Sequence, residues 1–355
     1  MARFGPATLS QFFCGGVSIT DPLVSVVLCG YNQGQYLAHA VESVLAQTYS
    51  NIELILIDNG STDDSREIAR RYASHSKVQL LLHEVGATVG KRSNEGIAAS
   101  SGRFISFLWA DDWYLLEKTE VQMEAFARLP SDYGVVYSPG YRHNEETGRE
   151  WHDGTPEWSG WVLEPMLRDY HRAWLNMDAP LVRRECFIRF PFYEDVFLEA
   201  ETIFLRIATV YRYHFVPRPL VVTRDHHSNL GKAYEYLTQW NLLLLKRLQR
   251  EEAFPARLVP LLDRVRATSM RNLGWKMIRL AGERSKGRAC LEASLEWGAL
   301  NVFHPRFVAG MAMSVLPLPL LGQANRLANR IRRHRENIEF VTDIGEGGRL
   351  RIPQE

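Results

Sequence analysis

The chain has 355 residues, of which 46% are hydrophobic and 23% are charged. These fractions are those of an ordinary globular protein and exclude a disordered or collagen-like chain. Lys and Arg number 42 against 41 Asp and Glu, so the net charge of +1 argues against a general nucleic-acid-binding protein. A chain of this length exceeds what one compact core usually holds, so we expect a large domain with a smaller unit attached.

The cysteines and the chain start predict a cytoplasmic protein. Four cysteines lie far apart without any C-x-x-C pair, which predicts reduced thiols. Residues 1–22 contain no continuous apolar block, so we expect a flexible leader rather than a secretion signal. The longest apolar stretch, residues 307–321, falls short of the roughly 20 residues that a membrane-spanning helix needs.

From Val24 onward, short apolar runs alternate with amphipathic segments, a pattern typical of a mostly parallel α/β sheet with crossover helices. The predicted strands cover residues 24–29, 52–57, 78–82, 104–109, 134–137, 179–184 and 213–223. The predicted helices of this part cover residues 36–45, 61–72, 116–127 and 196–210, the second capped by Ser61 or Thr62. A hairpin rich in Trp, Gly and His is expected after residue 137.

Beyond residue 231 the strand signals stop. Apolar residues recur at helical spacing over residues 234–248, 259–278 and 291–303. The last segment is rich in glycine and charge, which is typical of disorder. We therefore expect a leader (1–22), an α/β domain (23–231), a helical C-terminal extension (232–340) and a disordered tail (341–355).

Polar residues follow three of the predicted strands. Tyr31 comes after the first strand, Asp58 and Asn59 after the second, and Asp111 and Asp112 after the fourth. In an open α/β sheet, ligands bind beyond the carboxyl ends of the strands. Neighbouring carboxylates there favour a divalent cation, Mg²⁺ or Mn²⁺, whose remaining ligands are diphosphate oxygens and water. The alternative is a solvated Asp-Asp turn that caps a helix.

The order of these motifs resembles a known family. Residues 24–63, VSVVLCGYNQGQYLAHAVESVLAQTYSNIELILIDNGSTD, resemble the opening of family 2 glycosyltransferases, which carry the GT-A fold. Residues 94–98 and 102–105 resemble the segment before that family's metal motif, and residues 108–113 (LWADDW) resemble the motif itself. The resemblance spans residues 24–231 and implies an inverting, metal-dependent transfer of sugar from a nucleoside diphosphate sugar to a hydroxyl acceptor.

The resemblance also implies roles for the residues at the strand ends. Tyr31 and Asp58 would contact the base and ribose, Asp111 would lie near the ribose, and Asp112 would bind the metal. An aromatic ring can stack on a base, a carboxylate accepts hydrogen bonds from a base edge, and the metal neutralises the departing diphosphate.

Asn59 stands where family members often have a second acid. An amide offers both a donor and an acceptor, which matches the mixed edge of uracil or thymine better than the donor edge of guanine. This residue favours a uridine or thymidine donor.

The catalytic base departs from the family pattern. Aligning Leu205-Arg206 with the family places Glu199 and Ala200 opposite its usual Glu-Asp pair, so the expected Asp is missing. Glu201 is the preferred substitute and Glu199 the second choice. A surface pair of acids at a helix start explains Glu199 and Glu201 equally well.

Two basic sites are candidates for phosphate binding. Lys91 and Arg92 precede a predicted helix, and His226 lies in a stretch after the last strand that is similar to the family's R-x-H pattern. His226 is a candidate for contact with the metal or the diphosphate. In both places an ordinary solvated surface residue is the alternative.

The acceptor side carries two further signals. Trp151, Trp158 and Trp161 lie where acceptor sugars would dock, although core packing is the commoner role of such residues. Residues 306–335 combine an apolar stretch with several arginines, which suits peripheral contact with anionic lipid at the inner face of a membrane, or else a solvated basic helix. By family analogy the acceptor is a surface polysaccharide or a lipid-linked glycan.

Three other functions compete with this assignment. A sugar-phosphate nucleotidyltransferase resembles its own family in a basic, Gly-rich loop after the first strand, and residues 30–34 contain neither Lys nor Arg. A nicotinamide dehydrogenase requires G-x-G-x-x-G, which Gly30 and Gly34 do not form. A non-catalytic nucleotide-sugar or glycan-binding module stays open because of Ala200.

Overall fold

The computed structural model describes residues 21–172, 175–196, 199, 202–227, 229, 234–281 and 283–316. The chain divides into two compact units, residues 1–261 and 262–355. This division lies beyond residue 231, where the sequence predicts the boundary, because the helix over residues 234–248 belongs to the first unit. The leader up to Thr20 and the tail from Val341 lie outside the described residues.

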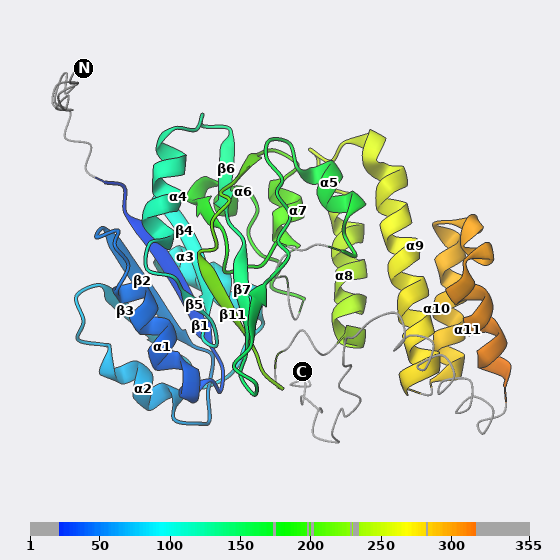
Figure 1. The fold of residues 1–355 in the computed structure, drawn as a ribbon, viewed down its shortest axis with the longest axis horizontal. Coiled ribbons are helices and arrows are strands. Elements are labelled where there is room, and N and C mark those ends of the chain that lie inside the picture. The colour runs from blue at the N-terminus through cyan, green and yellow to red at the C-terminus, as the bar shows by residue number, and fades with distance from the viewer. Residues whose placement is uncertain are drawn as a thin grey trace, which may run out of the picture. The chain divides into compact units, whose positions relative to one another are not determined.

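The first unit is built on a seven-stranded sheet in the order β10-β6-β9-β4-β1-β2-β3. Its strands are β1 (Val24–Gly30), β2 (Ile52–Asp58), β3 (Val78–Leu82), β4 (Phe104–Trp109), β6 (Tyr133–Tyr137), β9 (Leu181–Arg183) and β10 (Arg212–Phe215). All neighbours are parallel except β9, which is antiparallel to both β4 and β6. The predicted, mostly parallel sheet is confirmed (Figure 1).

Helices cover both faces of this sheet. The described helices of this unit are α1 (Gly34–Leu45), α2 (Ser65–Arg71), α3 (Val89–Ala99), α4 (Lys118–Ala127), α5 (Leu163–Arg168), α6 (Arg184–Arg189), α7 (Ile203–Ile207) and α8 (Tyr234–Leu248). Alternate residues of β1 point to opposite faces: Val26 and Leu28 belong to the core packed by α1 and α4, whereas Val27 lies against Gly96 of α3. The apolar stripe predicted for α1 is buried from Tyr36 to Val44.

A second sheet, in the order β5-β11-β7-β8, stands beside the first. Its strands are β5 (Trp113–Tyr114), β7 (Gly140–Asn144), β8 (Glu150–His152) and β11 (Val221–Asp225). The predicted hairpin is confirmed as β7 and β8. The prediction of a single strand over residues 213–223 is wrong. Pro217 and Pro219 interrupt the ladder of hydrogen bonds, so β10 (Arg212–Phe215) belongs to the main sheet and β11 to the second sheet.

Two helix starts differ from the sequence prediction. The helix expected from residue 196 begins at Ile203 as α7, and Glu199 before it is not helical. The helix α2 begins at Ser65, not at Ser61 or Thr62, because the Asp63 carboxylate accepts the Ser65 N–H at 3.0 Å. Ser61 instead binds the backbone of Asn32.

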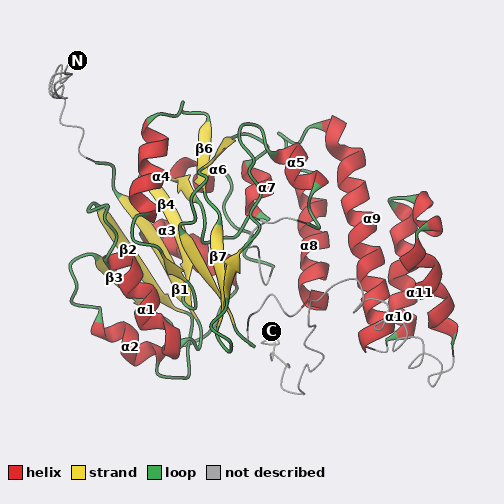
Figure 2. Cartoon of the chain, viewed as in Figure 1, coloured by secondary structure: helices red, strands yellow, loops and turns green. Residues whose placement is uncertain are grey.

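The second unit begins within α9 (Val259–Lys276), which continues as one π-helical turn, Met277–Ala281. The helices α10 (Arg284–Ala293) and α11 (Pro305–Val315) follow, and two 3₁₀ turns replace most of the helix expected over residues 291–303. Ile278, Leu291, Phe307 and Met313 form its core. Beyond β11 the described chain consists of helices and loops only, and no described helix is both long and apolar enough to cross a bilayer (Figure 2).

Candidate functional site

The ends of β1, β2 and β4 meet at one edge of the main sheet. In the ladder, Gly30 pairs with Asp58, and Cys29 pairs with Trp109 on its other side. Adjacent strands lie about 4.8 Å apart, so the residues that follow these strands are close neighbours. Gly30, Asp58 and Ala110 line the same small cavity, which shows the convergence directly.

Side-chain hydrogen bonds join the turn after β1 to the turn after β2. Asn32 adopts a left-handed conformation with φ 53°, its N–H donates to Ser61 Oγ at 3.0 Å, and its Oδ1 accepts the Thr62 N–H at 2.8 Å. The short polar side chain of asparagine tolerates this backbone shape. Tyr31, just before it, is 47% exposed. The turn therefore presents an aromatic ring beside the end of β2.

Asp58 is buried where β2 ends. Its Oδ2 accepts the Ser61 N–H at 3.1 Å and lies 3.9 Å from Arg66 Nε. Arg66 is engaged more closely by Glu84, at 2.6 Å. The Asp58 carboxylate thus has a fixed orientation at the sheet edge, with the Arg66 guanidinium nearby.

Asn59 is used within the protein. Its Oδ1 accepts the Ala87 N–H and Arg92 Nε, both at 2.8 Å, and its Nδ2 donates to the Ala87 carbonyl at 3.0 Å. The amide oxygen and the amide nitrogen, which would match a pyrimidine edge, both bond Ala87 in the loop before α3, and the oxygen also bonds Arg92. The contacts of Asn59 therefore give no support for a uridine or thymidine donor.

The two basic residues at the start of α3 have different environments. Arg92 is buried, and its guanidinium also bonds the Val85 carbonyl and Glu95, so it holds the loop before α3 rather than facing a ligand. Lys91 is exposed, and its backbone N–H donates to Thr88 Oγ1 at 3.3 Å. Of the pair, Lys91 is the one whose charge faces solvent.

Asp111 and His226 are brought together from distant parts of the sequence. His226 Nε2 lies 2.9 Å from Asp111 Oδ2, and the imidazole is buried against the ring of Tyr36. Arg224 donates from Nε to the Asp111 carbonyl at 2.9 Å, and its guanidinium lies over the rings of Tyr36 and Trp113. The end of β11 thus supplies a cation and an imidazole to the end of β4.

Asp112 is almost fully buried. Its Oδ1 accepts the Arg224 N–H at 2.7 Å, and Asp178 lies close enough for its charge to act on this carboxyl group. Burial, followed by the charges of Asp178 and Asp111, raises the pKa of Asp112 well above its ordinary value. The ionised form of Asp112 is therefore disfavoured while no cation is bound beside it.

The donor set at this edge fits a divalent cation shared with a bound diphosphate. Asp111, Asp112 and His226 offer carboxylate and imidazole ligands, which Mn²⁺ accepts, and a cation would relieve the repulsion that raises the pKa of Asp112. Within the described ranges, no three His, Cys, Asp or Glu side chains are arranged to hold a metal ion by themselves. Phosphate oxygens and water would then have to complete the shell.

Glu199 belongs to a second cluster of polar contacts, which is centred on Arg206. Glu199 is fully buried, accepts the Tyr193 N–H and lies 3.1 Å from Arg206 Nη1. Burial is the largest influence on this carboxyl group and raises its pKa, against the effect of Arg206. Glu201, the preferred base, lies outside the described residues.

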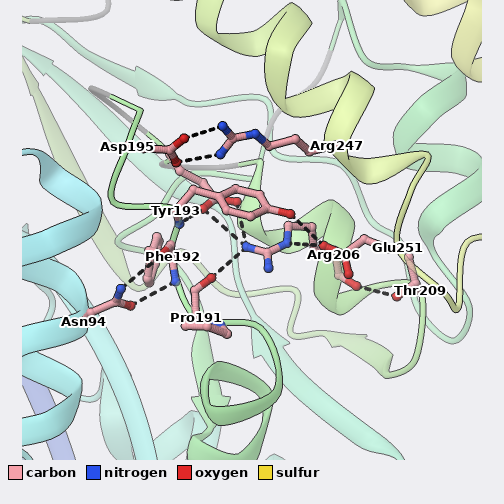
Figure 3. Close-up of polar contacts among 10 residues, drawn as sticks. Asn94, Pro191, Phe192, Tyr193, Asp195, Arg206, Thr209, Arg247 and Glu251 are labelled. Atoms are coloured by element: carbon pink, nitrogen blue, oxygen red, sulfur yellow. Dashed lines mark hydrogen bonds and ion pairs between the residues drawn. The ribbon is translucent and has the colours of Figure 1, made fainter.

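The same cluster ties the segment before α7 to the helix α8. The ring of Tyr193 lies between two guanidinium groups, 4.0 Å from that of Arg206 and 4.6 Å from that of Arg247 (Figure 3). Arg206 also bonds Glu251 at 2.8 Å, and Arg247 forms a two-point ion pair with Asp195. These contacts set the path of residues 191–196, which precede both candidate bases.

The three tryptophans of the predicted aromatic cluster do not form a core. Trp151 on β8 is 36% exposed and Trp161 is 61% exposed, while Trp158 is half-buried. No ring contact joins any two of them in the described part of the chain. The core-packing interpretation is therefore wrong for Trp151 and Trp161, whose rings are open to solvent.

Sequence reasoning missed three residues of the site. Asp178 accepts the Trp109 N–H at the end of β4, Glu145 binds Arg224, and Asn32 joins the turns after β1 and β2. Asn32 follows a strand end and belonged to the same inspection as Tyr31. Asp178 and Glu145 carry no local signal, because only the fold brings them to the site.

Comparison with known proteins agrees with this geometry. Residues 25–197 match the family model for glycosyl transferase family 2. An uncharacterized glycosyltransferase of Rickettsia prowazekii is 28% identical over 247 residues, which cover 66% of this chain and 75% of that protein. Glycosyltransferase GlyG of Streptococcus pneumoniae serotype 4 is 35% identical over 127 residues, which cover 36% of this chain and 42% of its own.

Solved structures show the fold. TarS of S. aureus, residues 1–349 in complex with UDP-GlcNAc, aligns with a TM-score of 0.63 at 14% identity over 88% of this chain and 92% of that chain. Mannosyltransferase PcManGT from Pyrobaculum calidifontis, in complex with GDP-Man and Mn²⁺, aligns with a TM-score of 0.54 at 17% identity over 89% of each chain. Residues 25–197 thus carry a glycosyl transferase family 2 domain, and the sheet with its converging strand ends has the GT-A fold that these solved structures share.

Proposed function

We propose that this glycosyltransferase is inverting and metal-dependent, and that it transfers a sugar from a nucleoside diphosphate sugar to a hydroxyl acceptor. The observation that carries the proposal is the convergence of Asp58, Asp111 and Asp112 at one sheet edge with His226 and Arg224. An acidic edge with one imidazole and one guanidinium suits a cation and a diphosphate held together.

Each residue has a proposed role in donor binding. Tyr31 and Asp58 contact the base and the ribose, Asp111 lies beside the ribose, and Asp112 and His226 hold Mg²⁺ or Mn²⁺. When bound, the cation neutralises the charge that develops on the departing diphosphate. The Arg224 N–H, which donates to Asp112 Oδ1 at 2.7 Å, supports this role by fixing the carboxyl group.

The proposed nucleotide is UDP or dTDP. Support comes from the TarS complexes, which hold UDP-GlcNAc and UDP and share this fold. The PcManGT complex holds GDP-Man, so a guanosine donor is the competing choice. Lys91, exposed at the start of α3, is the residue that we propose for contact with a phosphate.

Glu201 is the proposed catalytic base. The acceptor hydroxyl attacks C1 of the donor in line with the leaving diphosphate, the C1–O bond to the diphosphate breaks, and the hydroxyl proton passes to the carboxylate. Glu199 is already bound to Arg206 and Tyr193 in a buried position, which favours an anchoring role for it.

For the acceptor we propose a surface polysaccharide or a lipid-linked glycan at the inner face of a membrane. The exposed rings of Trp151 and Trp161 would contact its sugars. The basic segment 306–335 would contact anionic lipid. Sedimentation with vesicles tests the membrane contact: binding to anionic but not to neutral vesicles is expected, and equal absence from both would remove the segment's proposed role.

The test of the function is UDP release from UDP-sugars, measured with Mn²⁺ and with EDTA. Turnover should need the metal and should fall at least about a hundredfold in Asp112→Asn and in Glu201→Gln. Glu124→Gln, an exposed acid on α4, is the matched control and should match the wild type. Unchanged turnover in both site variants would show that the site is wrongly assigned.

A non-catalytic nucleotide-sugar-binding module is the second candidate, and the observation that favours it is Ala200 at the family's base position. The same experiment separates the two functions. Binding of UDP-sugars by the wild type, with no turnover on any acceptor supplied, would favour the binding module.

A further inference from the structure

We propose that the second unit binds the phosphate headgroup of an anionic lipid through Arg271 and Arg306, beside an exposed apolar turn. Arg271 lies on α9, and Arg306 lies in the first turn of α11. The inference rests on the membrane contact proposed above for residues 306–335, to which it gives a defined site. It does not depend on the roles proposed for the donor site.

Arg271 is a buried cation without an acidic partner. It is 7% exposed, and its Nε has no hydrogen-bond partner among the described residues. In the same part of the chain, no ion pair joins Arg271 or Arg306 to a carboxylate. Burial, followed by the charge of Arg306, lowers the pKa of Arg271. A buried charge without a partner of opposite sign is costly, so this position favours a bound anion.

Arg266, five residues earlier on α9, is the internal comparison. It is 5% exposed, and its Nη1 donates to Asp263 Oδ1 at 3.0 Å. The two arginines therefore share a helix and a degree of burial but differ in having a carboxylate partner. An anion from outside the unit would give Arg271 the partner that Arg266 has in Asp263.

A ring of hydrogen bonds brings Arg271 and Arg306 to one place. Arg271 Nη1 donates to Asn301 Oδ1, and the Asn301 carbonyl accepts the His304 N–H at 2.9 Å. His304 Nδ1 accepts the Arg306 N–H at 3.1 Å, and Arg306 Nη1 donates to Asn272 Oδ1 at 3.0 Å. Asn272 follows Arg271 on α9, which closes the ring. A guanidinium has five N–H groups, so both arginines keep donors for an anion.

The surrounding sequence is positively charged and contains no acid. Residues 297–335 include six arginines and neither Asp nor Glu. Burial, followed by the charges of Arg271 and Arg306, lowers the pKa of His304, so two positive charges act on the same turn. Phosphate esters are anionic at neutral pH, and the planar guanidinium matches the spacing of their oxygens. The ligand chemistry is therefore that of a phosphate group.

The turn that carries Asn301 is apolar and exposed. Leu300 is 80% exposed and Phe303 is 78% exposed in the 3₁₀ turn before α11. On α11 itself, Val308 and Val315 are 55% and 68% exposed. A free phosphate needs no such side chains, whereas a lipid headgroup lies above acyl chains into which they can insert. This combination favours a lipid as the source of the phosphate.

The first experiment compares melting temperatures of the full chain in sodium phosphate and in sodium chloride of equal ionic strength. Phosphate should raise the melting temperature of the wild type by several degrees more than that of Arg271→Met, because binding stabilises the folded state. Without phosphate, Arg271→Met should melt no lower than the wild type, whereas Arg266→Met leaves Asp263 unpaired and should melt lower. Arg264→Met, at an exposed position of α9, is the matched control and should respond to phosphate like the wild type.

The second experiment measures sedimentation with vesicles of phosphatidylglycerol and with vesicles of phosphatidylcholine. The wild type should bind only the anionic vesicles. Arg271→Met and Phe303→Ser should each weaken this binding about fivefold or more. Phe303→Ser should keep the wild-type response to sodium phosphate, because it removes an apolar contact and leaves both arginines in place.

Two results would overturn the inference outright. An equal response of the wild type and Arg271→Met to phosphate would show that Arg271 binds no anion. Binding to phosphatidylglycerol that survives both Arg271→Met and Phe303→Ser would refute this site while leaving the proposed membrane contact of residues 306–335 standing.

Two further results separate the sources of the phosphate and the levels of the proposal. A phosphate response lost in Arg271→Met, with unchanged vesicle binding, would support the anion site and overturn its assignment to a lipid. A wild type that binds neither kind of vesicle would remove the lipid assignment together with the proposed membrane contact. Neither result bears on the UDP-release assay, which tests the transferase site separately.

Discussion

Lys118 is the least expected charge in the molecule at the scale of single residues. It is almost fully buried, bonds Ser106 and Gln122, and lies 4.2 Å from the ring of Tyr114. Burial lowers the pKa of Lys118 from 10.5 to about 7, although the charge of Asp178 works in the opposite direction. Keeping Lys118 charged in the folded protein therefore lowers the free energy of unfolding near neutral pH.

This depressed pKa predicts a pH dependence that Lys118→Met removes. Between pH 7 and 10.5 the unfolded wild type binds more protons at this site than the folded protein, so the free energy of unfolding should rise with pH. Relative to Lys118→Met, the wild type should gain about 2–3 kcal/mol between pH 7.5 and 9.5. Urea unfolding of both proteins measures the difference, and a constant difference over this range would show that Lys118 titrates normally.

Gly60 gives a second prediction at this scale. It has φ 81°, and an added Cβ would lie 2.7 Å from the backbone nitrogen of Gly86, so Gly60→Ala combines backbone strain with a clash. Gly148, in the β7–β8 turn, has φ 66° and open space around it, so Gly148→Ala isolates the backbone term, which costs about 1 kcal/mol. Thermal unfolding should show the larger loss for Gly60→Ala, and equal losses would contradict the clash.

Single residues also show where sequence reasoning stops. The types and order of Asp58, Asp111 and Asp112 were enough to place them at one edge, because strand ends of a parallel sheet meet. The use of Asn59 was not predictable, because its partners Ala87 and Arg92 come from a later loop that folds back on it. The donor and acceptor of an asparagine amide can bond a nucleobase or a peptide group equally well, so the residue type alone does not tell which partner it has.

At the scale of elements, the segment before α7 is tied to α7 and α8 by ion pairs of unequal burial. Glu199 and Arg206 are both buried, whereas the Asp195 side chain that binds Arg247 is 65% exposed. Removing one partner of a buried pair leaves an uncompensated charge, which costs about 3–5 kcal/mol. Exposed pairs contribute about 1 kcal/mol or less.

The prediction is a large contrast between two similar substitutions. Arg206→Met should lower the free energy of unfolding by about 3 kcal/mol or more, and Arg247→Met by about 1 kcal/mol or less. Denaturant unfolding measures both. Similar losses in the two variants would contradict the burial difference between the pairs.

The sequence predicts an element well where the spacing of apolar residues and the turn residues at its ends lie within the element itself. The strands β1 to β4 and the helix α1 follow from runs and stripes of apolar residues. The antiparallel direction of β9 was not predictable, since a short buried strand has the same apolar run in either direction. The division of residues 213–223 into β10 and β11 was marked by Pro217 and Pro219, a signal that the prediction overlooked.

At the scale of the whole molecule, the function depends on one convergence of distant parts. Residues near positions 31, 58, 111, 178 and 226 reach a single edge through two sheets. The balanced total charge of the chain conceals this local excess of acids. Sequence order and family resemblance indicated the edge, and the contacts that orient its side chains came only from the fold.

The most direct test of the proposed donor site is a crystal structure of the protein in complex with UDP and Mn²⁺, in which anomalous scattering locates the metal. The uracil and ribose should lie beside Tyr31 and Asp58, and the manganese peak should lie within about 2.5 Å of a carboxylate oxygen of Asp111 or Asp112 and of the diphosphate. A nucleotide bound away from the ends of β1, β2 and β4, or manganese remote from both carboxylates, would contradict it.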